Sequence, residues 1–124
     1  MKILTIIVRI LLGLAFVVFG LNFFLNFIPQ PPPPPGLAGD YVKVFVASHY
    51  HYAVGAMQLL SGLMLLVGRF VALGLTILGA ILYNIIVFHV LMAPEGLGFA
   101  SVFVVLWAFL VWQYRDRFAG LLKP

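Results

Sequence analysis

The side chains that could do chemistry in this chain are few, and almost all are neutral amides and imidazoles. The 124 residues include three histidines and three carboxylates but no cysteine. Thiol catalysis, thiolate-held metal clusters, disulfides and covalent haem attachment are therefore excluded. No nucleophile, base and acid stand at a spacing typical of covalent catalysis, and no glycine-rich phosphate loop is present. We expect no catalytic residue, and a chain that is not an enzyme on its own.

Six polar side chains are the candidates for a ligand-binding site. They are Gln58, Asn84, Asn22, His51, Tyr83 and His89. Together they would form an outward-opening pocket, with amide donors and acceptors beneath a rim of imidazoles. A quinone ring would suit it, because the ring needs an apolar slot and its carbonyls need hydrogen-bond donors. The alternative is that the amides join helices to one another, at about 0.6–2 kcal/mol each in a membrane.

The histidines also raise the question of a metal or haem site. Residues two apart on a helix point about 200° away from each other, so His49 and His51 would chelate together only in an extended segment. His89 and Glu95 would have to complete such a site. A b-type haem between His51 and His89 would need imidazoles facing across a wide pocket. We expect no metal and no bound cofactor, with a quinone as the alternative.

These groups lie on segments that composition assigns to a membrane. With 65% hydrophobic and 8% charged residues, and a mean hydropathy of +1.19, the chain has too little charge to cover a soluble domain. Four stretches reach the roughly 20 apolar residues that cross a hydrocarbon core of about 30 Å. They are residues 3–28, 44–67, 70–92 and 97–114, with a proline-rich outer loop at 29–40. The sequence therefore predicts one all-α domain, an integral membrane four-helix bundle.

The basic residues predict the orientation of this bundle. With four spans, Lys43 falls on one side and the other basic residues on the opposite side: Lys2, Arg9, Arg69, Arg115, Arg117 and Lys123. Lysine and arginine are retained on the cytoplasmic side of membranes. Both termini are therefore expected in the cytoplasm. The net charge of +4 indicates contact with anionic headgroups and not a nucleic-acid footprint.

Small and polar residues at helical spacing predict which faces meet. Such residues line one face in each span, where small side chains let backbones approach and polar ones seek partners. The expected faces are Arg9, Gly13, Phe16 and Gly20; His51, Gly55, Gln58, Gly62 and Arg69; Ala72, Thr76, Ala80 and Asn84; and Ser101, Val105 and Ala108. Asn22 and Asn26 lie opposite the first face. Either that helix is buried on both sides, as in an oligomer, or the asparagines cap its outer end.

Gln58 and Asn84 are expected at the same depth, a few ångströms outside the bilayer centre. A very short turn at Gly68-Arg69 makes their helices neighbours. We therefore expect the two amides to approach each other, directly or around a small molecule. On the outer side, residues 31–35 form a polyproline rod of roughly 15 Å. It would act as a strut, since a ligand for a cytoplasmic recognition domain would lie on the wrong side.

Several short stretches resemble the DoxX-like family of membrane proteins and together cover nearly the whole chain. They are residues 9–16, 19–22 with the prolines that follow, 58–62 continuing to 66–70, 84–89 followed by 94–97, and 114–118. The resemblance implies a four-helix protein of the bacterial inner membrane, linked to quinone-dependent redox complexes. This chain departs from the family pattern in two places. His49 stands where the family often has glycine, and Ala93 replaces an expected acidic residue.

Two functions follow from the residues and the resemblance together. The first is a non-catalytic subunit or scaffold of a membrane redox system. The second is a binder or carrier of a small apolar or quinone-like molecule in the outer pocket. Quinone reduction by this chain alone is disfavoured, because it has neither a flavin motif nor a thiolate. The expected partners are the lipid bilayer, a membrane redox partner and a second copy of the chain, and no nucleic acid.

Overall fold

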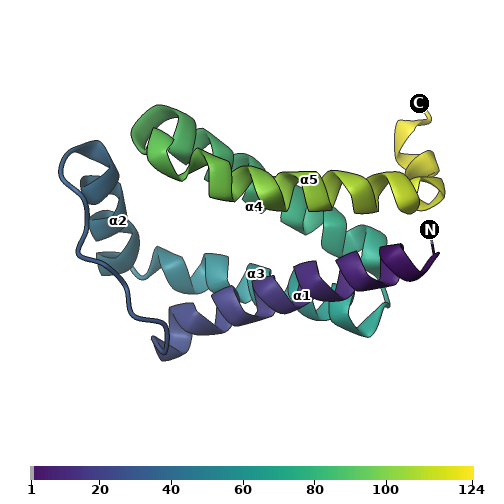
Figure 1. Ribbon diagram of the computed structural model, residues 1–124, viewed down its shortest axis with the longest axis horizontal. Coiled ribbons are helices and arrows are strands. Elements are labelled where there is room, and N and C mark those ends of the chain that lie inside the picture. The colour runs from purple at the N-terminus through teal and green to yellow at the C-terminus, as the bar shows by residue number, and fades with distance from the viewer. Residues whose placement is uncertain (1) are drawn as a thin grey trace.

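The computed structural model describes residues 2–124, with the side chain of residue 122 left out, and these residues fold into helices without strands (Figure 1). The elements are α1 (Lys2–Leu25), α2 (Leu37–Ala47), α3 (Tyr50–Val67), α4 (Val71–Met92), η1 (Pro94–Gly96), α5 (Leu97–Gln113) and η2 (Arg115–Leu122). Four segments are long and apolar enough to cross a membrane: Lys2–Leu25, Tyr50–Val67, Val71–Met92 and Pro94–Gln113. The predictions of an all-α chain and of four such segments are confirmed.

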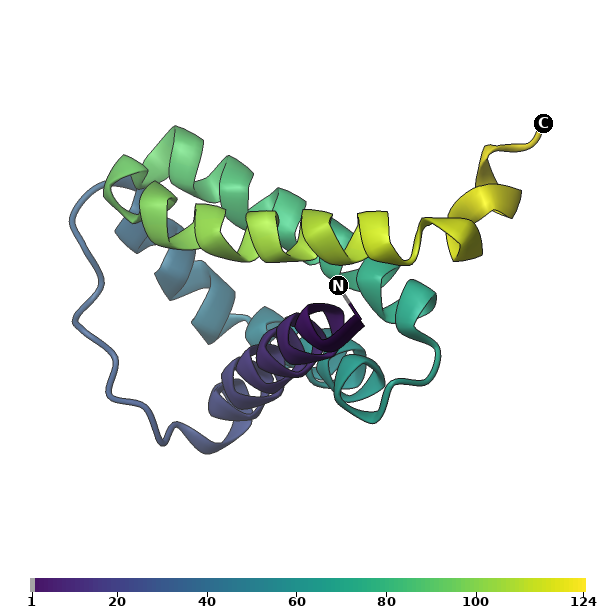
Figure 2. The same ribbon diagram turned by 45° about the vertical axis from the view of Figure 1, so that its right-hand side comes forward.

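The long helices form two layers, with α1 beside α3 in one and α4 beside α5 in the other (Figures 1 and 2). The contact between α1 and α3 is made by glycines. A Cβ added to Gly13 would lie 2.9 Å from the carbonyl oxygen of Gly62, and one added to Gly20 would lie 2.8 Å from that of Gly55. Such distances leave no room for any side chain. On the predicted faces of these two helices, Gly13, Phe16 and Gly20 of α1 and His51, Gly55, Gln58 and Gly62 of α3 are buried as expected. Arg9 is half-buried and Arg69 is exposed.

The predicted faces of the third and fourth spans are not the ones that these helices bury. In α4 the residues Thr76, Ala80 and Asn84 are exposed, although Ala80 and Asn84 line a cavity between α3 and α4, and α5 exposes 66% of Val105. The helices instead bury Val71, Gly74, Leu75, Leu78 and Leu82 of α4, and Ala100 and Leu110 of α5. Thr76 and Asn84 need no partner on another helix, because their side chains donate to backbone carbonyls one turn back, at 2.8 and 2.9 Å.

The first span ends three residues earlier than predicted. Asn26 has φ 51°, in the left-handed region where asparagine often ends a helix. The side-chain oxygen of Asn22 accepts the N–H of Ile28 at 2.8 Å. Asn22 itself is only 6% exposed. The structure thus favours capping of the helix end over burial in an oligomer.

The second predicted span is broken, and this is the main difference from the sequence analysis. Residues 44–67 were expected to form one helix, but α2 ends at Ala47 and α3 begins at Tyr50. His49 lies between them with φ 63°, and Ser48 Oγ accepts the N–H of Tyr50 at 3.3 Å. The predicted loop at 29–40 accordingly contains the start of α2. This short helix runs across the end of the molecule that lies away from the termini (Figure 1).

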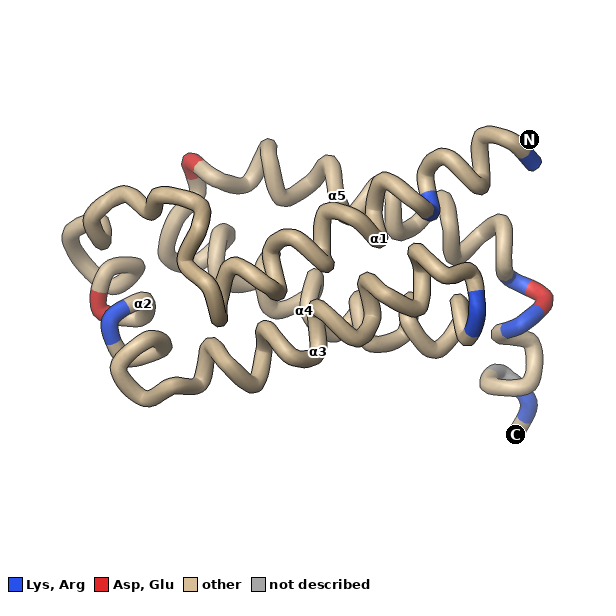
Figure 3. The backbone as a smooth tube through the Cα atoms, turned by 90° about the horizontal axis from the view of Figure 1, so that it is seen from below, with Lys and Arg blue, Asp and Glu red and all other residues tan. Residues whose placement is uncertain are grey.

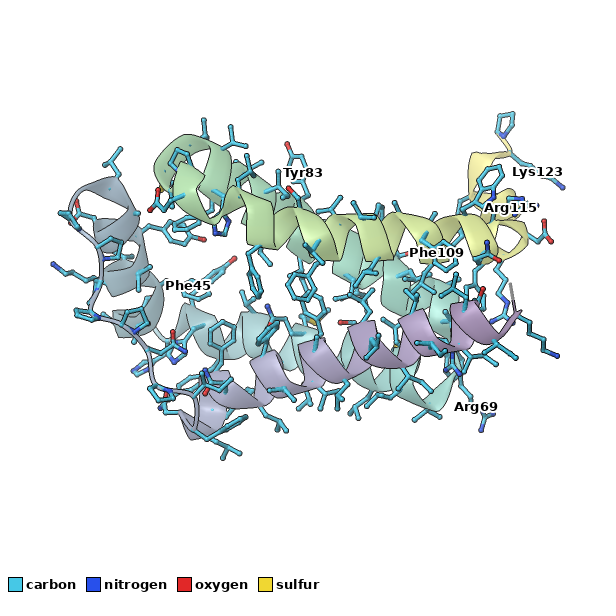
Figure 4. All side chains as sticks on the ribbon, viewed as in Figure 1. Phe45, Arg69, Tyr83, Phe109, Arg115 and Lys123 are labelled. Atoms are coloured by element: carbon cyan, nitrogen blue, oxygen red, sulfur yellow. The ribbon has the colours of Figure 1, made fainter. Side chains whose placement is uncertain are left out.

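Charged residues lie toward the two ends of the long helices (Figure 3). Most basic residues gather at the end that carries both termini, where Arg69, Arg115 and Lys123 are labelled in Figure 4. Arg9 reaches the last turn of α3, where its Nη1 donates to the carbonyl of Leu65 at 2.6 Å. A cation there is favourable because the last carbonyls of a helix lack partners and carry partial negative charge.

Candidate functional site

A cavity of about 380 Å³ lies between α3 and α4, beneath α2. Its volume is within the range of sites for small organic molecules. Ala80 and Asn84, two of its lining residues, are exposed near the middle of α4. The cavity therefore opens on the flank of the molecule and not only at its end. Val54, Ile81 and Ile85 make up the aliphatic part of its wall.

Aromatic rings form the rest of the wall, and Phe45 of α2 stands at their centre. Its ring centroid lies 5.8 Å from that of Tyr41, 5.9 Å from Phe23 and 6.0 Å from Tyr50. Figure 4 shows Phe45 directed from α2 into the space between the two layers. Tyr41 also contacts Phe88 of α4 at 5.0 Å. Through these rings α2 contacts α1, α3 and α4, so the position of α2 determines the shape of the cavity.

Gln58 is the buried polar group of this cavity. Only 5% of the residue is exposed, and within residues 2–124 its Oε1 has no hydrogen-bond partner. The buried positions Gly55 and Gly62 flank it on the same face of α3, where α1 passes at close contact. Leaving a buried polar atom unpaired costs about 1–3 kcal/mol. No described residue offsets this cost for Gln58 Oε1.

Asn84 and His89 also line the cavity, and each has one side-chain nitrogen in contact with a backbone carbonyl. Asn84 Nδ2 donates to the carbonyl of Ala80, and His89 Nδ1 lies 2.8 Å from that of Ile85. A carbonyl oxygen can only accept, so Nδ1 carries the hydrogen and Nε2 of the neutral ring is an acceptor. The ring is held over Gly96, where an added Cβ would lie 2.5 Å from His89 Cδ2. Asn84 therefore offers a second N–H donor and its Oδ1 acceptor, and His89 offers Nε2 as an acceptor.

The lining carries no formal charge. None of the residues around the cavity is a lysine, arginine, aspartate or glutamate. Asp40 lies on α2 and Glu95 in η1, both near the cavity in the fold but outside its lining. The site is thus a neutral, mainly aromatic pocket with hydrogen-bonding groups from α3 and α4.

The structure brings together three of the six predicted site residues: Gln58, Asn84 and His89. The two amides line one cavity without a hydrogen bond between them, and their approach around a small molecule stays a prediction. Asn22 caps α1 instead. His51 is buried beside the rings of Phe23 and Phe45, with its Nδ1 unpaired, but it does not line the cavity. Tyr83 is 69% exposed and points away from the α1–α3 layer (Figure 4).

His49 and His51, which were considered as metal ligands, do not form a chelating pair. His49 is exposed and stacks on Tyr52 at 5.6 Å, while the His49 and His51 ring centroids are 6.3 Å apart. In the described part of the chain, no three histidine or carboxylate side chains are placed to hold a metal ion.

The aromatic wall was not predicted from the sequence. One signal points to it: lining residues recur four apart, as in Tyr41 and Phe45 of α2 or Asn84 and Phe88 of α4. That spacing places side chains on one helix face. Phenylalanine is so frequent in this chain, at twelve residues, that the pattern does not stand out.

Comparisons of the chain with protein-family models, with curated proteins and with solved structures found no match.

Proposed function

We propose that this protein binds a small, largely apolar molecule within the membrane, in the cavity between α3 and α4. The observation that carries the proposal is an aromatic cavity of about 380 Å³ lined by Gln58, a buried amide whose Oε1 lacks a partner among residues 2–124. A bound molecule with one polar group would pair with the Gln58 amide, which has two N–H donors and one acceptor oxygen, and its apolar body would fill the remaining space. Quinone-like compounds are one class with this character.

The lengths of the helices, the distribution of basic residues and the resemblance to DoxX-like proteins support the proposal that the protein lies in the bacterial inner membrane. Four helices are long and apolar enough to cross a bilayer. The basic residues gather at the end with both termini, which supports cytoplasmic termini (Figure 3). The cavity would then lie in the outer half of the membrane. The resemblance to DoxX-like proteins adds a quinone-linked redox system as the setting, and a role as its non-catalytic subunit stays a prediction.

Thermal unfolding of the purified protein in mild detergent tests the proposal. A ligand that binds only the folded state raises stability, by about 2.7 kcal/mol at one hundred times its Kd. We expect short-chain quinone analogues or similar ring compounds to raise the Tm of the native chain. The variant Gln58→Leu should lose this response, whereas Tyr83→Leu, on the exposed side of α4, should keep it. An unchanged Tm with every such compound at saturation would refute the proposed binding.

A further inference from the structure

We propose that a second site, a groove at the turn from α3 to α4, binds one anionic phospholipid. The phosphate of this lipid contacts Arg69, and the first part of one acyl chain lies along α3. The groove is separate from the cavity described above, since the two share no lining residue. The proposal therefore does not depend on the proposed function.

The groove has an apolar wall that ends at a charged side chain. Its volume is about 410 Å³, and it is lined by Leu60, Leu63, Met64 and Val67 of α3 together with Arg69 and Phe70. The four α3 residues recur at helical spacing and lie on one face. From the first to the last of them this face runs about 10 Å along the helix, whereas one leaflet of the hydrocarbon core is about 15 Å deep. The wall thus suits the part of an acyl chain nearest its headgroup.

The rest of the protein leaves this lining largely uncovered. Five of the six lining residues are exposed, and only Met64 is half-buried. Lipid covers such a surface in any membrane protein, so the apolar wall alone does not select an occupant. The selection comes from the charge at its end.

Two guanidinium groups lie at the turn. Arg69 is exposed, and Figure 4 shows it projecting from the end of the molecule that carries both termini. Arg9 of α1 lies against the preceding residue, because a Cβ added to Gly68 would be 3.0 Å from Arg9 Cζ. Its Nη1 donates to the carbonyl of Leu65, a contact that leaves its positive charge without a carboxylate. The turn therefore combines two positive charges with an apolar groove.

Acidic residues do not neutralise this charge. The groove lining contains no aspartate or glutamate, and Asp40 in α2 and Glu95 in η1 belong to the opposite end of the molecule (Figure 3). The third acidic residue, Asp116, stands between two arginines in η2. Arginine pairs well with phosphate oxygens. A headgroup with a net negative charge, as in phosphatidylglycerol, complements the turn, whereas the choline of phosphatidylcholine would add a further cation there.

The test measures the binding of dioleoyl phosphatidylglycerol and dioleoyl phosphatidylcholine to the purified protein in detergent, by native mass spectrometry. The two probes have the same acyl chains and differ in the charge of the headgroup. We expect the first phosphatidylglycerol to bind about fivefold more tightly than the first phosphatidylcholine, the effect of one basic side chain near an anionic headgroup. In Arg69→Gln this preference should disappear. Arg115→Gln, which changes an exposed arginine of η2 outside the groove, should retain it.

A second pair of variants tests the acyl contact. Val67→Trp fills the groove and should lose the tight binding of the first phosphatidylglycerol, whereas Val105→Trp should keep it. The two positions are matched, at 67% and 66% exposed, and Val105 lies outside the groove. Equal affinities of the two lipids for the native chain would overturn the proposal, and so would a preference that survives Arg69→Gln. Unchanged binding in Val67→Trp would show that the groove is not the site. The comparison of lipids on the native chain needs no variant to fold.

Discussion

At the scale of single residues, the proposed binding site depends most on Gln58. Buried amides in lipid usually pair with another helix, and the sequence left this open for Gln58. The structure gives its Oε1 no partner within the described residues, although only 5% of the residue is exposed. Asn22 is the contrasting case, because the residue is equally buried, at 6% exposed, but its oxygen accepts the N–H of Ile28. The first amide keeps an unpaired oxygen, and the second maintains a helix end.

This difference predicts opposite effects on stability. Without ligand, Gln58→Leu should leave the free energy of unfolding unchanged or raise it by about 1–3 kcal/mol, since it removes an unpaired buried oxygen. Asn22→Leu should lower it by about 1 kcal/mol, because the end of α1 loses its cap. Unfolding of the purified variants in detergent and denaturant measures both. A loss of 0.6–2 kcal/mol in Gln58→Leu would instead identify the amide as an interhelical contact.

At the scale of the helices, the contact faces of α1 and α3 could be predicted, whereas those of α4 and α5 could not. Glycines and polar residues are rare enough in α1 and α3 for their spacing to identify the buried face. In α4 and α5 apolar residues lie on every side, and lipid solvates them as well as the core does, so the pattern contains no burial signal. The break at His49 was missed for a different reason. Positions with positive φ are usually occupied by glycine, so a histidine at such a position gives no sign of the break in the sequence.

The glycine contact between α1 and α3 predicts a strong effect of a small change. In Gly62→Ala the added methyl would lie 2.8 Å from both the carbonyl oxygen of Gly13 and the backbone nitrogen of Val17. Backbone atoms cannot move aside like a flexible side chain, so the helices must separate, at a cost of about 1–3 kcal/mol. Gly98→Ala is the matched control in α5, where the new methyl meets nothing within 4 Å. Equal stability of the two variants would contradict the close crossing.

At the scale of the whole molecule, three of the twelve residues that line the candidate site followed from the sequence. Polar residues are scarce in the spans, so Gln58, Asn84 and His89 stood out. The rings around them did not, because their position depends on α2, a helix that the sequence analysis merged with α3. Phe45 reaches the cavity because the chain turns at Ser48 and His49, between α2 and α3. Which of twelve phenylalanines line a cavity is a property of tertiary packing.

The gathering of basic residues at one end predicts the topology of the molecule. The chain has no cysteine, so single cysteines report position without background. In intact bacterial cells, Gln30→Cys should react with a membrane-impermeant maleimide, whereas Lys123→Cys should react only after the cells are opened. Both residues are exposed, which makes them comparable sites. Labelling of Lys123→Cys from outside would reverse the orientation and place the cavity in the inner half of the membrane.

The flank opening at Ala80 and Asn84 has a consequence for how occupancy should be expressed. With α4 placed across a bilayer, as proposed, an opening near its middle would meet acyl chains, and the proposed ligand would arrive after dissolving in the bilayer. The quantity that governs saturation is then the mole ratio of ligand to lipid, and the concentration in water matters only through the partition coefficient. Two compounds with the same contacts in the cavity would differ in potency by the ratio of their partition coefficients. Dose–response curves taken at different lipid contents should superimpose only when plotted against that mole ratio.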